Sequence, residues 1–251
     1  MRTLLAGFCI VVVASGQWIN QPASNIPRKA DGKPDLEAAA PKLADGKPDL
    51  QGIWETDPKY NNNLAADLPP DAVPMQPWAE QVLRQRRDQT VGKDDPEGYC
   101  LPPGVPRVHG VPFPQKILQY PNVIIFLYET RNTFRQVHMD GRKLPVDPQP
   151  AWMGYSVGHW DGDTLVVESS GFTDKTWLDD VGHPHTEVLR VTERFRRRNF
   201  GNLELRITID DPKAYTTPWT VTENFSLLPG AELIEYICNE NNRDIEHLVG
   251  K

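Results

Sequence analysis

The sequence predicts a mainly β protein whose antiparallel strands follow one another as a meander and close into a barrel. From residue 115 onward, apolar and polar residues alternate with a period of two. Turn signals separate these segments at regular spacing, as in "WDGD" (160–163), "NFGN" (199–202) and "LPGAE" (228–232). No crossover helices lie between the segments, which excludes a parallel α/β fold. A β-sandwich built from the same strands is the alternative.

The first 16 residues, "MRTLLAGFCIVVVASG", have the features of a secretory signal peptide. Arg2 precedes an apolar run, and small residues follow it, so cleavage is expected before Gln17. The run is too short to span a bilayer, and no other segment is apolar enough to do so. The sequence therefore predicts an exported protein, periplasmic or secreted, that does not span a membrane.

An N-terminal arm is expected over residues 17–50, which are rich in Pro, Asn, Asp and Ala. The heptapeptide "ADGKPDL" occurs at 30–36 and again at 44–50, too few copies for a solenoid. We expect this arm to be extended and partly disordered. It leads into a single domain over residues 51–251, which begins with a strand, "QGIWE" (51–55).

One helix is predicted before the barrel strands, at residues 77–89, "PWAEQVLRQRRDQ". Pro77 suits the first turn, and Trp78, Val82 and Leu83 share one stripe. An irregular, Pro-rich connector follows at residues 99–107. The further strands are predicted at 115–120, 122–129, 133–139, 154–160, 163–170, 187–198, 203–210, 218–228 and 232–239.

Two glutamates fall among inward apolar side chains. Glu193 lies in "VTERF" and Glu223 in "VTENF", each on the same face as the flanking valine and phenylalanine. Tight turns would place Glu193 opposite about Thr208 and Glu223 opposite about Arg206, with their backbones on the order of 10 Å apart. A buried carboxylate needs a partner or loses its charge, so each glutamate is either structurally paired, for example by Arg135, or functional.

The segment "GHPHTE" (182–187) raises the question of a metal site, because His183 and His185 form a His-x-His pair. A bound divalent metal is the less favoured reading, since no spacing selects the remaining ligands, and no cofactor is predicted. We expect a loop at the barrel mouth, in which His183 and His185 are both weak metal candidates. His185 is the better functional candidate, and a surface histidine is the alternative for His183. The other available donors are His109, His138, His159, Asp179 and Glu187.

Further candidates for contact with a ligand come from the strands and their ends. They are Arg135, His138, Tyr155, His159 and Trp177. The loop that contains Asp174, Asp179 and Asp180 lacks the spacing of an EF-hand, so an ordinary loop is favoured over a lid or a Ca²⁺ site.

The cysteines and the net charge restrict the partners. Cys9 leaves with the signal peptide, so Cys100 and Cys238 are expected to form a disulfide in an oxidising compartment, with two free thiols as the alternative. The formal net charge is −7, which argues against nucleic acid as a partner and against anionic membrane surfaces.

Several stretches together resemble a family of secreted proteins from soil and aquatic Gram-negative bacteria. They are "DGKPDLQGIW", "GKDDPEGYCLPPGVPR", "MGYSVGHWDGDTLVVESSGFTDKTWLD", "HTEVLRVTERFRRR" and "TIDDPKAYTTPWTV". The resemblance covers roughly residues 45–251. It implies export and supplies no activity. The predicted architecture is also similar to lipocalin-like (calycin-like) barrels, by analogy of shape alone.

Two functions follow from a barrel with inward carboxylates. The favoured one is a small-molecule-binding protein with an apolar and aromatic pocket inside the barrel. The alternative is a periplasmic hydrolase, lyase or isomerase, with His185 or His138 as base and Glu193 or Glu223 as acid. A scaffold in the cell envelope is a third reading. The chain contains no G-x-S-x-G, Walker, dinucleotide-binding or H-E-x-x-H motif that would identify a reaction.

Overall fold

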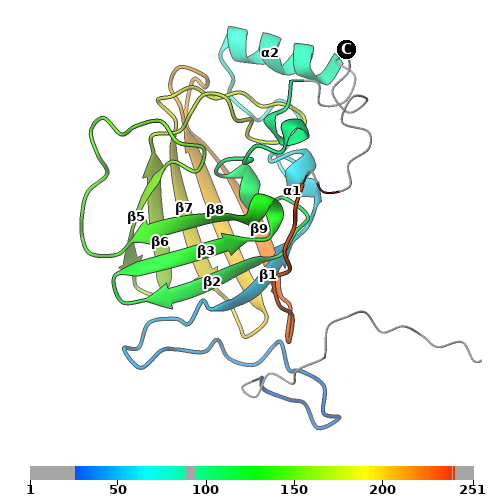
Figure 1. Cartoon of the computed structure of the whole chain (residues 1–251), viewed down its shortest axis with the longest axis vertical. Coiled ribbons are helices and arrows are strands. Elements are labelled where there is room, and N and C mark those ends of the chain that lie inside the picture. The colour runs from blue at the N-terminus through cyan, green and yellow to red at the C-terminus, as the bar shows by residue number, and fades with distance from the viewer. Residues whose placement is uncertain (1–25, 89–93, 239, 241–251) are drawn as a thin grey trace, which may run out of the picture.

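The computed structural model describes residues 26–88, 94–238 and 240. Its central feature is a closed barrel of nine strands, in which each strand pairs with the next and β9 pairs with β1 (Figure 1). This closure confirms the predicted barrel over the alternative sandwich. The strands are β1 (Gly52–Thr56), β2 (Gln115–Tyr120), β3 (Val123–Tyr128), β4 (Thr133–His138), β5 (Tyr155–Asp161), β6 (Thr164–Ser170), β7 (Arg190–Arg197), β8 (Asn202–Asp210) and β9 (Trp219–Leu227).

One pair of strands departs from the predicted antiparallel meander. β4 and β5 run parallel, with Val137 opposite Ser156 and His138 opposite Val157. The other neighbouring strands are antiparallel. Parallel neighbours need a long connection that returns the chain to its starting end, and residues 139–154 provide it.

Alternation along the strands fills the barrel with apolar side chains. Leu203, Leu205, Ile207 and Ile209 of β8 are buried, as the period of two predicts. Glu193 and Glu223 are both 0% exposed, so the predicted inward direction of the two carboxylates is confirmed. Large aromatic side chains from three other strands complete this core: Phe126, Phe195 and Phe225.

The strand registers differ from the prediction by one residue. Glu193 lies opposite Ile207 rather than Thr208, and Glu223 lies opposite Leu205 rather than Arg206. The exact register depends on how each turn closes, which the strand alternation does not define. The observed pairing keeps both glutamates beside apolar neighbours on the inner face.

The described part of the N-terminal arm contains two backbone turns. The same three backbone hydrogen bonds close residues 27–35 and residues 41–49, so both copies of the repeat form one kind of tight turn. Gly32 and Gly46 have φ values of 82° and 81°, which favour glycine. Leu50, at the end of the second copy, is completely buried against the barrel. The arm runs along the barrel end opposite α2 (Figure 1).

Short helices and loops cover the other end, which we call the mouth of the barrel (Figure 1). The predicted helix is confirmed as α2 and ends at Asp88. Residues 103–111 are buried throughout, and they bring His109 into contact with inward residues of the barrel. The helices are α1 (Lys59–Asn62), α2 (Pro77–Asp88), η1 (Pro96–Tyr99), η2 (Arg107–His109) and η3 (Thr130–Asn132).

The C-terminal segment does not form the strand predicted at 232–239, for which the structure describes residues 232–238. Because β9 already pairs with β1, the barrel has no free edge for another strand. The segment instead binds the outside of the barrel near η3, where the Ile234 N–H donates to Glu129. The predicted disulfide between Cys100 and Cys238 is present and joins this segment to the mouth.

The predicted signal peptide, residues 1–16, lies outside the described residues. Within the described residues, no helix has both the length and the apolar character needed to cross a membrane.

Candidate functional site

A polar cluster lies inside the barrel around Glu193. The Arg135 guanidinium donates to both of its carboxylate oxygens, at 3.0 Å for Nη1, and the His109 Nε2 atom lies 2.7 Å from Oε1. Arg135 also donates to the hydroxyls of Ser156 and Ser169, at 2.9 and 2.7 Å. These contacts satisfy the Glu193 carboxylate and orient the guanidinium.

These contacts keep Glu193 ionised. Burial by itself would raise the pKa of Glu193, but the Arg135 charge and the His109 hydrogen bond oppose it and lower the pKa to about 2. Arg135 is only 2% exposed and is also desolvated, so each charge depends on the other.

Glu223 has the same place in its strand motif but a different environment. Neither of its carboxyl oxygens has a hydrogen-bond partner among the described residues. Burial raises the pKa of Glu223 to about 8, and the negative charge of Glu193 adds to the shift. The side chain is therefore mostly a neutral acid at pH 7.

Aromatic side chains surround the cluster within the barrel. The His109 ring meets four aromatic rings edge-on, with centroid distances between 5.7 and 6.2 Å. The four rings are those of Phe126, Tyr128, Phe195 and Phe225. Side chains thus occupy the space beside Glu193 where the sequence analysis placed a ligand.

The two histidines of "GHPHTE" face different partners. His183 Nδ1 lies 2.5 Å from the Asp179 carboxylate, and His185 Nε2 lies 2.6 Å from the Thr176 hydroxyl. His183 is 2% exposed, so the expectation of a surface histidine is wrong. Burial lowers the pKa of His185 and keeps its ring neutral at pH 7. The described part of the chain contains no group of three or more His, Cys, Asp or Glu residues that could hold a metal ion.

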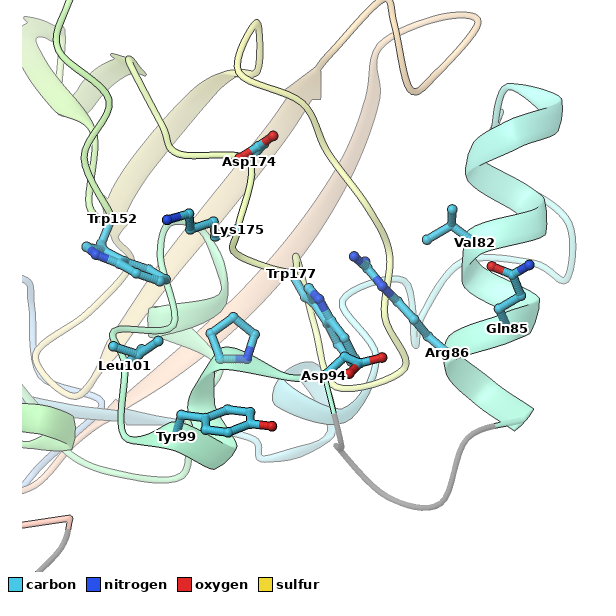
Figure 2. Close-up of a pocket in the computed structure, with 11 residues that line it drawn as sticks. Val82, Gln85, Arg86, Asp94, Tyr99, Leu101, Trp152, Asp174, Lys175 and Trp177 are labelled. Atoms are coloured by element: carbon cyan, nitrogen blue, oxygen red, sulfur yellow. The ribbon is translucent and has the colours of Figure 1, made fainter. Parts of the chain in front are cut away.

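A pocket of about 440 Å³ opens at the mouth, between α2, η1 and two loops (Figure 2). We call it the mouth pocket. Its walls combine aromatic rings with charges of both signs. The residues that line it are Val82, Gln85, Arg86, Asp94, Pro96, Tyr99, Leu101, Trp152, Asp174, Lys175 and Trp177.

Two interactions fix the wall of the mouth pocket at Trp177. The Arg86 guanidinium carbon lies 4.3 Å from the centre of the Trp177 ring, and its Nη1 donates to the Gly182 carbonyl at 2.9 Å. Next to Trp177, Thr176 is held by the hydrogen bond to His185. Through this hydrogen bond, His185 helps to fix the position of the loop that carries Trp177.

An ion cluster fixes the wall at η1. Arg107 is 2% exposed and binds the carboxylates of Asp95, Glu97 and Asp180, at 2.7 Å for Asp95 and 2.9 Å for Glu97. Asp95 also caps η1 by accepting from the Glu97 N–H at 3.0 Å. The disulfide at Cys100 then links this turn to the C-terminal segment. The ion pairs of Arg107 and the disulfide thus hold the η1 wall of the pocket in place.

The structure separates the residues that the sequence analysis grouped as ligand contacts. Arg135 is inside the barrel with the two glutamates, and Trp177 is in the mouth pocket. The other three are on the opposite face of their strands from Arg135 and Ser156, with the rings of His138 and Tyr155 stacked at 5.2 Å and His159 exposed. A ligand role for these three stays a prediction.

The role of His109 and most of the mouth pocket were not predicted from the sequence. His109 was considered only as a metal donor, yet it is 84 residues from its partner Glu193 in the chain. A signal was present in the apolar context "VPRVHGV", which is typical of a buried histidine. The pocket residues come from four separate segments, and no local motif links them.

No protein-family model matches the chain, and no curated protein sequence matches it.

Proposed function

We propose that the protein is an exported small-molecule-binding β-barrel whose ligand occupies the mouth pocket. One observation carries the proposal: a pocket of about 440 Å³ lined by Trp152, Trp177 and Tyr99 together with a few charged groups. Sites for small molecules usually have volumes of roughly 300–1,000 Å³ and combine apolar walls with a small number of polar groups.

The fixed walls support this proposal. Arg86 is stacked on Trp177, and Arg107 holds η1 through three carboxylates. A site that is already ordered loses little conformational entropy when a ligand enters, which favours affinity. The disulfide between Cys100 and Cys238 supports the exported location, periplasmic or secreted, because such bonds persist in oxidising compartments.

The proposed location differs from the barrel interior named by the sequence analysis. Inside, Glu193 is already paired with Arg135 and His109, and aromatic rings surround the cluster. At the mouth, polar and aromatic groups line an open pocket. The second location leaves room for a ligand without displacing the core.

Calorimetric titration with 2-naphthol, a neutral aromatic probe, tests the proposal. We expect the wild type to bind and Trp152→Leu to bind about tenfold more weakly, since a lost ring contact of about 1.4 kcal/mol has that effect. Tyr120→Leu is the matched control, because Tyr120 is also aromatic and 53% exposed but lines a different pocket. The proposal fails if the wild type does not bind, or if both variants weaken binding equally.

Native mass spectrometry of protein exported to a bacterial periplasm adds a test for a natural ligand. Extra mass that is lost on denaturation, and that is absent from Trp152→Leu, would support the mouth pocket. Extra mass that the variant retains in full would place the ligand elsewhere and contradict the proposed site.

A second function, acid–base catalysis inside the barrel, is favoured by the opposite pKa shifts of Glu193 and Glu223. Two carboxyls with separated pKa values can act as base and acid. It ranks second because both are completely buried. Reaction with phenyldiazomethane, which esterifies protonated carboxyls, tests access: a label on Glu223 in the folded protein at pH 7 supports this function. If Glu223 is not labelled in the folded protein under conditions that label the unfolded chain, the result contradicts this function.

A further inference from the structure

We propose that the mouth pocket takes an aromatic monocarboxylate, with the carboxylate bound by Arg86 and the ring held against Trp152 and Trp177. This inference rests on the proposed function and names the chemical class of the ligand. It depends on how the arginines of this chain are paired.

Arg86 is a half-buried cation without an ion-pair partner within 4.0 Å among the described residues. Among the described residues, its guanidinium has one hydrogen-bond acceptor, the Gly182 carbonyl, and one aromatic contact, the face of Trp177. Two deeply buried arginines, Arg107 and Arg135, differ because each binds carboxylates. Arg86 therefore retains guanidinium N–H groups that no described protein group accepts.

Arg197 shows an arginine whose N–H groups the protein itself satisfies, and at 7% exposed it is more buried than Arg86. It too is stacked on aromatic rings, with its guanidinium carbon 4.9 Å from the centre of the Trp54 ring. Its N–H groups, however, donate to four backbone carbonyls, those of Asp49, Gln51, Asn199 and Phe200. Arg86 has one such acceptor and faces an open pocket, which favours a ligand as its missing acceptor.

Burial also disfavours the charged form of the Arg86 guanidinium. Desolvation lowers the pKa of its guanidinium to about 10, despite the opposing influence of Asp95, Tyr215, Asp179 and Asp94. The group is still charged at pH 7. A bound carboxylate would offset this desolvation, and its two oxygens match the fork of the guanidinium.

The other charges around the pocket restrict the ligand to one negative charge. Lys175 lines the same pocket, and in Figure 2 Arg86 and Lys175 lie on the two sides of Trp177. Asp94 and Asp174 also line it and would repel a second anionic group. Trp152 lies beyond Lys175 in this view, and its indole ring lines the pocket, where it can contact an aromatic group.

The test compares two probes of nearly equal shape, naphthalene-2-carboxylate and naphthalene-2-carboxamide, by calorimetric titration at pH 7. We expect the carboxylate to bind the wild type about tenfold more tightly than the carboxamide, as a charge-assisted bidentate contact would give. Arg86→Gln should remove this preference and leave carboxamide binding within about twofold of the wild type.

Two variants accompany Arg86→Gln. Arg84→Gln is the matched control, because Arg84 is on the same helix, pairs with Glu80 at 3.0 Å and does not line the pocket. It should keep the full preference for the carboxylate. Arg86→Lys keeps the positive charge but lacks the two parallel N–H donors of the guanidinium, so it should retain part of the preference for the carboxylate. This variant also tests the inference if Arg86→Gln does not fold.

The outcomes separate this inference from the proposed function. Equal binding of both probes to the wild type leaves the binding site in place and overturns the anionic ligand. Tighter binding of 2-naphthylmethylamine than of the carboxylate also overturns it, because Asp94 and Asp174 would then select the ligand. If neither naphthalene probe nor 2-naphthol binds, the proposed function fails as well.

Discussion

The interior of the barrel and its mouth both contain charged groups, but they satisfy them differently. Inside, Arg135 contacts Glu193, Ser156 and Ser169, and its charge is fully paired. At the mouth, Arg86 has one carbonyl acceptor and an aromatic face. A buried charge that is completely paired maintains the fold, whereas a half-buried one that lacks an acceptor is available to a ligand. The two guanidinium groups thus differ both in burial and in the acceptors that the protein gives them.

The interior side of this comparison predicts the largest effect. Arg135→Met leaves the Glu193 carboxylate buried without its main partner, so we expect the free energy of unfolding to fall by about 4 kcal/mol. Urea denaturation at pH 7 measures it. A loss of less than about 1 kcal/mol would show that the pair is not structural.

The matched control replaces both partners. Arg135→Met combined with Glu193→Met removes both charges and should recover part of the lost stability, because a buried ion pair replaced by apolar groups often costs little. If the double variant is less stable than Arg135→Met, the Glu193 carboxylate is stabilised mainly by His109 and not by the arginine.

The disulfide is the next largest contribution, and it acts at the mouth. Replacing Cys100 and Cys238 by serine should lower the free energy of unfolding by about 3 kcal/mol, because the bond joins residues far apart in the chain and restricts the unfolded state. Urea denaturation gives the value. Hydrogen exchange should increase more at residues 96–101 than in β8, and an equal increase in both would contradict a local role at the mouth.

The two glutamates predict opposite pH dependences within the interior. The pKa of Glu223 is raised from an ordinary value of 4.5 to about 8, so the folded state holds this proton more tightly than the unfolded state. As the pH rises from 4.5 to about 8, the Glu223 contribution therefore lowers the free energy of unfolding by about 1.4 kcal/mol for each pH unit. Denaturation at pH 6 and pH 7 measures the slope, which Glu223→Gln should remove.

Glu193 acts in the other direction, because its pKa is lowered to about 2. Its contribution is present above the ordinary pKa and is lost as the pH falls from 4.5 toward 2. Glu223→Gln should leave this acid limb unchanged. A Glu223→Gln variant with the wild-type slope between pH 6 and pH 7 would show that Glu223 is not a neutral acid in the folded protein.

The sequence was sufficient to predict which strand residues face the barrel interior, but not which side chains bind the buried glutamates there. Period-two alternation predicts that Glu193, Glu223 and the apolar residues of β8 face inward, and burial confirms it. The partner His109 comes from an irregular segment, 103–111, which has no periodicity that a pattern could detect. The prediction of a strand at 232–239 was wrong because β9 pairs with β1, and a local pattern does not show pairing between strands so far apart in the chain.

The mouth pocket was less predictable, for a physical reason. Its walls combine one helix, one turn and two loops, and tertiary packing alone brings them together. Trp177 was named as a ligand contact from its place in a loop, whereas Arg86 was hidden in the polar face of the predicted helix. An arginine beside two others in "RQRR" gives no sign that it stacks on a distant tryptophan.

The smallest expected effect completes the comparison between the interior and the mouth. Arg86→Gln loses a cation–π contact and one hydrogen bond, each worth about 1 kcal/mol, and it removes a desolvated charge, which offsets much of the loss. We therefore expect the free energy of unfolding to change by less than about 1 kcal/mol, against about 4 kcal/mol for Arg135→Met. Urea denaturation of the two variants side by side decides the matter. A similar loss in both would make Arg86 a structural residue, and a difference of the expected size would leave its charge available for the ligand.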